Sequence, residues 1–164
     1  MENLEVLHSK IIPQEKLQSV LTYWRFKEYR VVFTNGCFDL LHKGHIEYMA
    51  RAADQGDILV LGLNSDKSVK RIKGDSRPVQ DESSRSLVLA ALKFVTAVVL
   101  FDEETPYELI KLVQPDVLVK GADYNEEDIV GADIVKARGG EIRTITLTEG
   151  YSTTDIIRKI KQNN

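Results

Sequence analysis

The amino-acid sequence predicts an α/β fold, a single doubly wound sheet of about five parallel strands with helices on both faces. Five short segments rich in β-branched residues recur along the 164 residues, and most are nearly continuous apolar runs. Such runs are typical of strands that are covered on both faces, as in a parallel sheet. Segments with a helical repeat of apolar residues separate them, and this alternation favours right-handed βαβ crossovers.

The five expected strands are RVVFT at 30–34, DILVLGL at 57–63, TAVVL at 96–100, DVLVK at 116–120 and EIRTITL at 141–147. In a doubly wound sheet, ligands bind beyond the carboxyl ends of the strands. The residues that follow each strand are therefore the first candidates for a functional site.

Three of the expected helices are indicated by apolar residues that share one helical face. We expect the first over Gln14–Arg25, the second after His45 as far as Ala53, and the third between Ser83 and Phe94. Each lies before or between two of the expected strands, as the crossovers require.

Other helices are indicated by their ends. Thr105 and Pro106 form an N-cap and first-turn pair. Residues 126–138 have a helical pattern that stops at Gly139-Gly140, and a capping box at 152–155 opens the last helix. Residues 64–81, which are polar and basic, form the longest irregular stretch.

We expect two parts in the chain, an N-terminal helical extension at 1–29 that packs on a domain at 30–164. The formal net charge of −3 argues against a general nucleic-acid binder. The sequence shows neither a membrane-length apolar run nor a signal peptide. Cys37 is the single cysteine, which excludes an internal disulfide and a thiolate metal cluster within one chain. We therefore expect a cytoplasmic protein without nucleic-acid or membrane partners.

The segment TNGCFDLLHKGH leaves the first strand and enters the next helix. A helix N-terminus presents free N–H groups and a partial positive charge, so it attracts anions. His42 and His45 are three residues apart and share one face of the first turn, where imidazoles can bind phosphate. Capping and packing roles are one alternative. A zinc site is another, for which Asp39 is the only further local ligand.

FTNGCFDLLHKGH resembles the signature of the nucleotidyltransferase superfamily that is defined by its H-x-G-H motif, which includes the cytidylyltransferases and phosphopantetheine adenylyltransferase. EGYSTTDIIRKI at 149–160 resembles the second signature of that superfamily, which usually ends in I-S-T-T. LNSDKSVKRIKGDSRPV, LAALKFV and PDVLVKGADY narrow the resemblance to the D-glycero-β-D-manno-heptose 1-phosphate adenylyltransferases, which form the second domain of bifunctional heptose kinase/adenylyltransferases. The resemblance extends over about residues 31–160.

The resemblance implies a Rossmann-like fold and the transfer of AMP from ATP to heptose 1-phosphate, which yields ADP-heptose for lipopolysaccharide biosynthesis and pyrophosphate. The sugar phosphate attacks the α-phosphorus in line, so catalysis consists of positioning and charge stabilisation. Mg²⁺ is expected to be held through the phosphates and water, without a protein ligand that can be named. The alternatives are a CTP-dependent cytidylyltransferase acting on glycerol 3-phosphate or ethanolamine phosphate, and a non-catalytic nucleotide-binding module.

By the same resemblance, His42, His45 and Lys73 are the catalytic residues, with Lys70 as the alternative lysine. The nucleotide-binding residues lie at strand ends and helix starts: Thr34, Asn35, Gly36, Cys37, Phe38, Arg85, Lys120, Gly121, Asp123, Ser152, Thr153 and Thr154. Arg85 matches an arginine that contacts phosphate, and a surface ion pair with Glu82 or Asp81 is an equal alternative.

The loop after the second strand carries a basic patch formed by Lys70, Arg71, Lys73 and Arg77. A charge run is usually a solvated face, but a basic loop beside an anion site can close over a triphosphate. Asp66 precedes this patch and either orients a loop or substrate hydroxyl or forms a local turn.

Two departures from the cytidylyltransferase pattern argue against CTP. Leu147 stands where those enzymes carry an arginine, and Tyr151 replaces their isoleucine. The sequence lacks the kinase domain that often precedes this module, so we expect a separate heptose kinase to supply the sugar phosphate. The family likeness also implies a homodimer.

Overall fold

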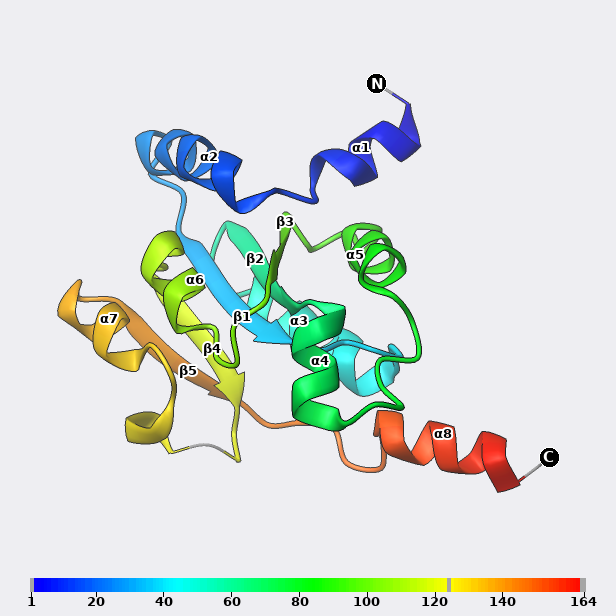
Figure 1. The fold of residues 1–164 in the computed structure, drawn as a ribbon. Helices are drawn as coiled ribbons and strands as arrows, with labels where there is room; N and C mark the ends of the chain where they lie inside the picture. The colour runs from blue at the N-terminus through cyan, green and yellow to red at the C-terminus, as the bar shows by residue number, and fades with distance from the viewer. Residues whose placement is uncertain (1, 124, 163–164) are drawn as a thin grey trace.

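Five parallel strands form one sheet in the order β3-β2-β1-β4-β5. The computed structural model describes residues 2–123 and 125–162, so Tyr124 of the KGADY segment lies outside the described residues. The strands are β1 Val31–Gly36, β2 Ile58–Asn64, β3 Ala97–Phe101, β4 Val117–Gly121 and β5 Glu141–Ile145. This sheet confirms the predicted doubly wound α/β fold (Figure 1).

Helices connect the strands and cover the sheet (Figure 1). Among the described residues they are α1 Asn3–Ser9, α2 Gln14–Phe26, α3 Lys43–Ala53, α4 Asp66–Lys73, α5 Glu82–Ala90, α6 Tyr107–Val113, the 3₁₀ helix η1 Glu126–Asp128, α7 Ala132–Ala137 and α8 Thr153–Gln162. None of these helices has the length and apolar character that a membrane crossing requires.

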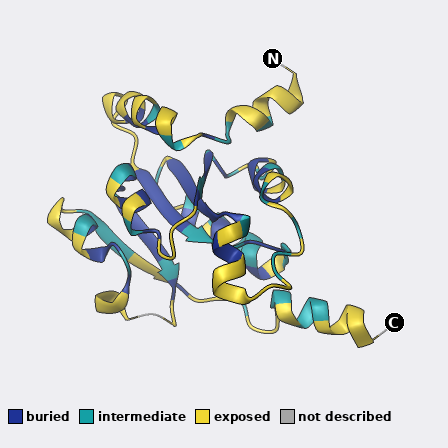
Figure 2. Ribbon diagram, viewed as in Figure 1, coloured by how far each residue is buried: buried dark blue, intermediate teal, exposed yellow. Residues whose placement is uncertain are grey.

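The two faces of the sheet bury separate apolar clusters, because successive strand residues point to opposite faces. On one side, Phe33 and Leu118 pack with α2, α6 and α7, and we call this side the α6 face. On the other side, Val32 and Val119 pack with α3 and α5, and we call it the α3 face. Figure 2 shows the buried central strands between largely exposed helix surfaces, whereas the outer strand β5 is mostly half-buried or exposed.

The N-terminal segment is joined to the sheet and to its core. The Ile12 N–H donates to the Val98 carbonyl at 2.9 Å, and Ile11 forms a parallel bridge with Val98 at the outer edge of β3. On α2, Leu17 and Leu21 are fully buried in the α6-face cluster. A domain boundary between residues 29 and 30 stays a prediction.

Residues 64–81 were expected to be irregular, and this prediction is wrong, because α4 occupies Asp66–Lys73. The Ser65 side chain accepts the N–H of Ser68 and caps the helix, while Gly74 ends it at a φ of 95°. Lys70, Arg71 and Lys73 therefore lie on the last turns of a helix and not in a loop.

The single helix expected over 126–138 is also a wrong prediction, because η1 and α7 are separate. Gly131 has a φ of 86°, and a Cβ at this position would lie 2.7 Å from the Ile110 side chain. This turn brings α7 against α6 and interrupts the helical pattern. The sequence also failed to indicate α1, and α5 ends at Ala90, before the expected Phe94.

Candidate functional site

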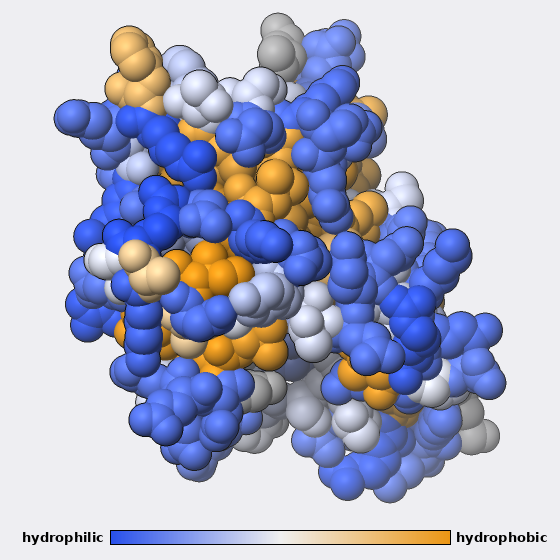
Figure 3. Space-filling model, turned by 60° about the vertical axis from the view of Figure 1, so that its left-hand side comes forward, coloured by the Kyte–Doolittle hydropathy of each residue, from blue (hydrophilic) through white to orange (hydrophobic). Residues whose placement is uncertain are grey.

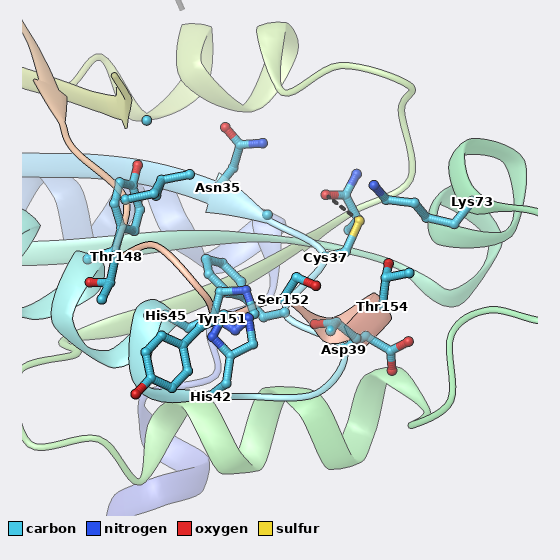
Figure 4. Close-up of a pocket in the computed structure, with 18 of the residues that line it drawn as sticks. Asn35, Cys37, Asp39, His42, His45, Lys73, Thr148, Tyr151, Ser152 and Thr154 are labelled. Carbon is cyan, nitrogen blue, oxygen red and sulfur yellow. Dashed lines mark hydrogen bonds between the residues drawn. The ribbon is translucent and has the colours of Figure 1, made fainter. Parts of the chain in front are cut away.

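A pocket of about 550 Å³ opens at the carboxyl ends of β1, β2 and β4 (Figure 4). In the strand order, β2 and β3 lie on one side of β1, and β4 and β5 lie on the other. The boundary between β1 and β4 is the topological switch point, where doubly wound folds bind ligands. The lining residues come from the strand ends, the start of α3, the end of α4 and the segment before α8: Asn35, Gly36, Cys37, Phe38, Asp39, His42, Gly44, His45, Tyr48, Asn64, Ile72, Lys73, Arg77, Lys120, Gly121, Asp123, Leu147, Thr148, Tyr151, Ser152, Thr153 and Thr154.

The turn between β1 and α3 is held in a rare backbone conformation. Phe38 has a φ of 44°, which is uncommon for a bulky residue. Its buried side chain packs in the α3-face cluster and contacts the His45 ring edge-on, with centroids 5.5 Å apart. Packing therefore fixes the turn from which the histidines project, as is common where strained backbone is retained at a functional site.

His42 and His45 lie side by side at the start of α3 (Figure 4). His42 is the N-cap residue, and its ring stacks on that of His45 with centroids 3.8 Å apart and planes at 21°. Gly44 leaves room for this pair, because a Cβ there would lie 3.2 Å from the His42 ring. The Nδ1 atoms of both rings are buried, and neither has a hydrogen-bond partner among the described residues.

Burial favours the neutral form of both imidazoles in the ligand-free protein. It lowers the pKa of His42, and it lowers the pKa of His45 to about 4. The neighbouring His42 also lowers the pKa of His45, whereas the Leu40 backbone acts in the opposite direction. A neutral imidazole donates one hydrogen bond, and a bound anion would raise both pKa values by favouring the charged form.

The lowered pKa of His45 predicts how stability depends on pH. Between the ordinary pKa of 6.5 and the folded value of about 4, the unfolded chain binds a proton that the folded chain does not. The free energy of unfolding should therefore decrease as the pH falls from 6.5 towards 4, and this contribution should be constant above 6.5. Urea unfolding at pH 7.5 and 5.0 measures the effect.

His45→Asn should lose less stability than wild type over the same pH interval, because the variant lacks this titrating group. The exposed His8 on α1 provides a matched control, since His8→Asn should keep the wild-type dependence. Equal pH dependence in wild type and His45→Asn would show that burial of this imidazole does not contribute.

Asp39 holds the segment after α4 against the pocket. Its buried carboxylate accepts hydrogen bonds from Arg77 Nε at 2.6 Å and from the Val79 and Gln80 amides at 2.9 and 3.0 Å. Burial acts to raise the pKa of Asp39, but these backbone hydrogen bonds and the Arg77 guanidinium together lower it. Both charged groups are thus committed to a structural ion pair at the pocket wall.

The zinc alternative needs further ligands beside the two histidines. Asp39 is not available as a zinc ligand, because its oxygens accept hydrogen bonds from Arg77 and from backbone amides. Across residues 2–123 and 125–162, no three His, Cys, Asp or Glu side chains gather so that they could hold a metal ion. The arrangement suits an anion better than a zinc ion.

Lys73 is the basic residue of α4 that reaches the pocket. Figure 4 shows its side chain directed towards Cys37. Burial raises the pKa of Cys37, and Lys73 is the first of the cations that oppose this effect. By contrast, Lys70 is exposed, pairs with Asp75 at 3.5 Å and does not line the pocket.

The end of β4 contributes a second lysine. Lys120 Nζ donates a hydrogen bond to Asn35 Oδ1, and burial lowers the pKa of Lys120 to about 8. The next residue, Gly121, allows the Asp123 carboxylate to fold back, since a Cβ there would lie 2.6 Å from Asp123 Oδ1. These residues form the wall of the pocket opposite α4.

The start of α8 closes the pocket beside the histidines. Ser152 Oγ accepts the Asp155 N–H at 3.0 Å and donates to the Asp155 carboxylate at 2.8 Å, which caps the helix. Thr153 Oγ1 donates to the Leu40 carbonyl at 3.2 Å and joins this helix to the turn before His42. Tyr151 stacks near His42, with ring centroids 6.3 Å apart. The N-termini of α3 and α8 therefore meet at one site.

Four of the predicted site residues do not line the pocket: Thr34, Asp66, Lys70 and Arg85. The Thr34 hydroxyl is buried and shares a hydrogen bond of 2.8 Å with the Tyr48 hydroxyl. Asp66 starts α4 and forms an ion pair of 2.8 Å with Arg85. Their assignment to substrate binding stays a prediction, and the structure gives each of them a bonding role inside the protein.

Arg85 is almost completely buried, with 1% of its surface exposed. Its Nη1 donates to the Cys37 and Asn64 carbonyls at 2.7 and 2.8 Å, and its Nε donates to the Gln80 carbonyl at 3.0 Å. The predicted surface pair with Glu82 or Asp81 is wrong, because the partner is Asp66. Burial of the guanidinium under the pocket floor explains the difference.

Several lining residues were not assigned to the site from the sequence, and two of them had a recognisable signal. Asn64 ends β2 and faces the same edge of the sheet as Asn35. Thr148 lies just before the second signature and donates a hydrogen bond to Glu47 on α3. Tyr48 and Ile72 provide aromatic and apolar surface that no motif indicated, whereas Leu147 and Tyr151 were noted as departures from the cytidylyltransferase pattern without being assigned to the site.

Comparison with known proteins identifies related sequences. Residues 33–159 match the family described as cytidylyltransferase-like. The chain is 46% identical to the bifunctional protein HldE of Wolinella succinogenes, over 98% of this chain and 35% of that protein. It is 50% identical to HldE of Helicobacter pylori strain G27, over 97% of this chain and 33% of the relative. The chain thus spans about a third of the length of these curated relatives.

Solved structures show the same fold. A lipopolysaccharide core biosynthesis protein from Thermoplasma volcanium is 28% identical with a TM-score of 0.58, over 76% of this chain and 99% of that one. Pantoate-beta-alanine ligase from Francisella tularensis, 14% identical, has a TM-score of 0.59 over 92% of this chain and 77% of its own. The second likeness shows the fold alone.

Proposed function

The chain belongs to the cytidylyltransferase-like family, and on that premise we propose that it is a nucleotidyltransferase that transfers AMP from ATP to D-glycero-β-D-manno-heptose 1-phosphate. The products are ADP-heptose and pyrophosphate. The observation that carries the proposal is the stacked His42–His45 pair at the N-terminus of α3, beside the start of α8. Two helix N-termini and two imidazoles that converge on one pocket suit a polyphosphate.

In the proposed mechanism, an oxygen of the sugar phosphate attacks the α-phosphorus of ATP in line, and the bond to the bridging oxygen of pyrophosphate breaks. His42 and His45 donate hydrogen bonds to phosphate oxygens and gain proton affinity as negative charge develops on the leaving group. Lys73, at the end of α4, adds positive charge on the wall of the same pocket. The protein supplies no nucleophile, so Cys37 takes no covalent part.

The pocket fits a magnesium ion that is held mainly through phosphates. Mg²⁺ prefers oxygen ligands and keeps several of its waters. Two carboxylates line the pocket, and the Asp39 oxygens are occupied by Arg77 and backbone amides, which leaves the exposed Asp123. The ion would neutralise phosphate charge and help pyrophosphate to leave.

Two observations favour this reading over a CTP-dependent enzyme with a small acceptor. Leu147 lines the pocket as an apolar side chain where the cytidylyltransferases carry arginine. One solved relative is described as a lipopolysaccharide core biosynthesis protein, which supports a sugar acceptor. The relatives named HldE are described as bifunctional, and this chain covers about a third of each. By the family resemblance, we propose that the second activity is a heptose kinase that supplies the sugar 1-phosphate. The homodimer and the cytoplasmic location stay predictions.

Pyrophosphate release tests the proposal. ATP and CTP are each combined with heptose 1-phosphate, glycerol 3-phosphate and ethanolamine phosphate in the presence of Mg²⁺. We expect release with ATP and heptose 1-phosphate only. Release with CTP and a small acceptor would identify the alternative enzyme, and ATP binding without release for any acceptor would identify a nucleotide-binding module.

Lys73→Ala is expected to lower the turnover rate by about 10²-fold and to weaken ATP binding much less, because its charge acts mainly on the leaving pyrophosphate. Lys70→Ala is a matched control on the same helix, since Lys70 is exposed and pairs with Asp75. Steady-state rates and ATP-analogue binding measure both effects. An unchanged rate in Lys73→Ala together with a slow Lys70→Ala would transfer the role to Lys70.

A further inference from the structure

Lys120 is a cation in the pocket wall that has no anionic partner in the part of the chain that the structure describes. Its ammonium donates to Asn35 Oδ1, which is a neutral amide oxygen. Among the described residues, no carboxylate lies within ion-pair distance of Lys120, whereas Arg77 in the same pocket is paired with Asp39. Lys120 is half-buried, and a charge withdrawn from water without an ionic partner is unfavourable, so the protein keeps this ammonium at a cost in stability.

The position of Lys120 is set by the sheet. Val32 and Phe33 of β1 pair with Val117 and Leu118 of β4, and the same register places Asn35 opposite Lys120. These two strands form the topological switch point. The hydrogen bond between the two side chains therefore spans the crevice in which a ligand of this fold binds.

Alternation along the strands shows to which face Lys120 belongs. Phe33 and Leu118 point to the α6 face, so Asn35 and Lys120, two residues further on, point there as well. The histidines project from α3, which covers the opposite face. Gly121 is one residue after Lys120 and therefore faces the α3 side, and the Asp123 carboxylate folds over it.

This inference rests on the reaction proposed above. The placements separate the side of the pocket suited to the attacking group from the side suited to the leaving group. In an in-line displacement, the nucleophile approaches the α-phosphorus opposite to the leaving group. His42 and His45, which are suited to the leaving pyrophosphate, lie on the α3 side of the pocket. We propose that Lys120, held by Asn35 on the α6 side, binds the phosphate of the sugar 1-phosphate acceptor and directs its oxygen to the α-phosphorus.

The electrostatics of Lys120 agree with this role. Burial alone lowers its pKa to about 8, so the ammonium is weakly solvated and binds an anion more strongly than an exposed lysine does. A phosphate would give this half-buried charge an anionic partner. Asn35 keeps the lysine extended towards the pocket until the acceptor arrives.

Lys120→Met tests the proposal, because it keeps the length and apolar stem of the side chain and removes the charge. Calorimetry of heptose 1-phosphate, added to protein saturated with a non-hydrolysable ATP analogue, measures acceptor binding separately from turnover. We expect the acceptor Kd to increase by about 10- to 100-fold and the Kd of the ATP analogue alone to change less than about threefold. Lys111→Met, an exposed lysine on α6, is the matched control and should change neither.

Folding of the variant is checked by its melting temperature. Because Lys120→Met removes a half-buried charge that has no ionic partner among the described residues, the melting temperature should be no lower than that of wild type. Lys120→Arg, which keeps the charge, should recover part of the acceptor affinity.

The outcomes separate this inference from the proposed function. An acceptor Kd equal to wild type, or a loss confined to the ATP analogue, would overturn the role of Lys120. If wild type releases no pyrophosphate but Lys120→Met still weakens binding of heptose 1-phosphate, the proposed reaction fails and the phosphate site stands. If wild type releases pyrophosphate normally but Lys120→Met binds the acceptor as tightly as wild type, the proposed reaction stands and the role of Lys120 fails.

Discussion

His42→Ala and His45→Ala are each expected to lower pyrophosphate release by about 10²–10³-fold, because each removes a hydrogen-bond donor from the charge that develops on the leaving group. The stacked rings share one site at the N-terminus of α3, so the two losses should not be additive in the double variant. Initial rates of pyrophosphate release at saturating ATP measure the effect.

The same variants should remain folded. Neither imidazole donates or accepts a hydrogen bond through Nδ1 among the described residues, so truncation leaves no broken bond at these atoms. His8→Ala on α1 is the control and should retain full turnover, since His8 lies on an exposed helix outside the pocket. Near-wild-type rates in both His42→Ala and His45→Ala would refute the polyphosphate site.

Arg85→Ala is expected to reduce the free energy of unfolding by about 3–5 kcal/mol. The guanidinium is buried and bonded to three backbone carbonyls and to Asp66. Its removal leaves these acceptors without partners and opens a cavity under the pocket floor. Urea unfolding monitored by circular dichroism measures the loss.

Two further variants separate this structural role from a contact with phosphate. Arg85→Lys should recover little of the stability, because an ammonium cannot reproduce the planar set of donors. Arg143→Ala, which removes an exposed arginine from β5, should change stability by less than about 1 kcal/mol. If Arg85→Ala kept wild-type stability and specifically raised the KM for ATP, the arginine would belong to the nucleotide site.

The sheet could be predicted from the sequence because its strands are local and strongly patterned. Residues 58–63 of the segment DILVLGL are buried throughout in β2, so their apolar character is continuous. The short helix α4 left a weaker signal, since Val69 is its only buried apolar residue and its ends are defined by Ser65 and Gly74. The break at Gly131 depends on the approach of Ile110, which lies far away in the sequence.

The candidate site, like the fold, could be predicted from the sequence only in part. H-x-G-H and S-T-T were recognisable because each motif lies at a helix N-terminus that follows a strand, and the structure brings both to one pocket. The surroundings of Arg85 could not be read from the sequence, because its acceptors come from residues 37, 64, 66 and 80. The same holds for Lys120, because its lack of an anionic partner within residues 2–123 and 125–162 is a property of the folded chain.

The bridge between Ile11 and Val98 also bears on solubility. A bare outer strand can pair with another molecule and start aggregation. Residues 10–12 occupy that place along β3, while the outer strand β5 carries the charged residues Glu141 and Arg143. A shortened chain that begins at β1 would uncover the apolar strand β3, so it should self-associate even where its pocket is intact.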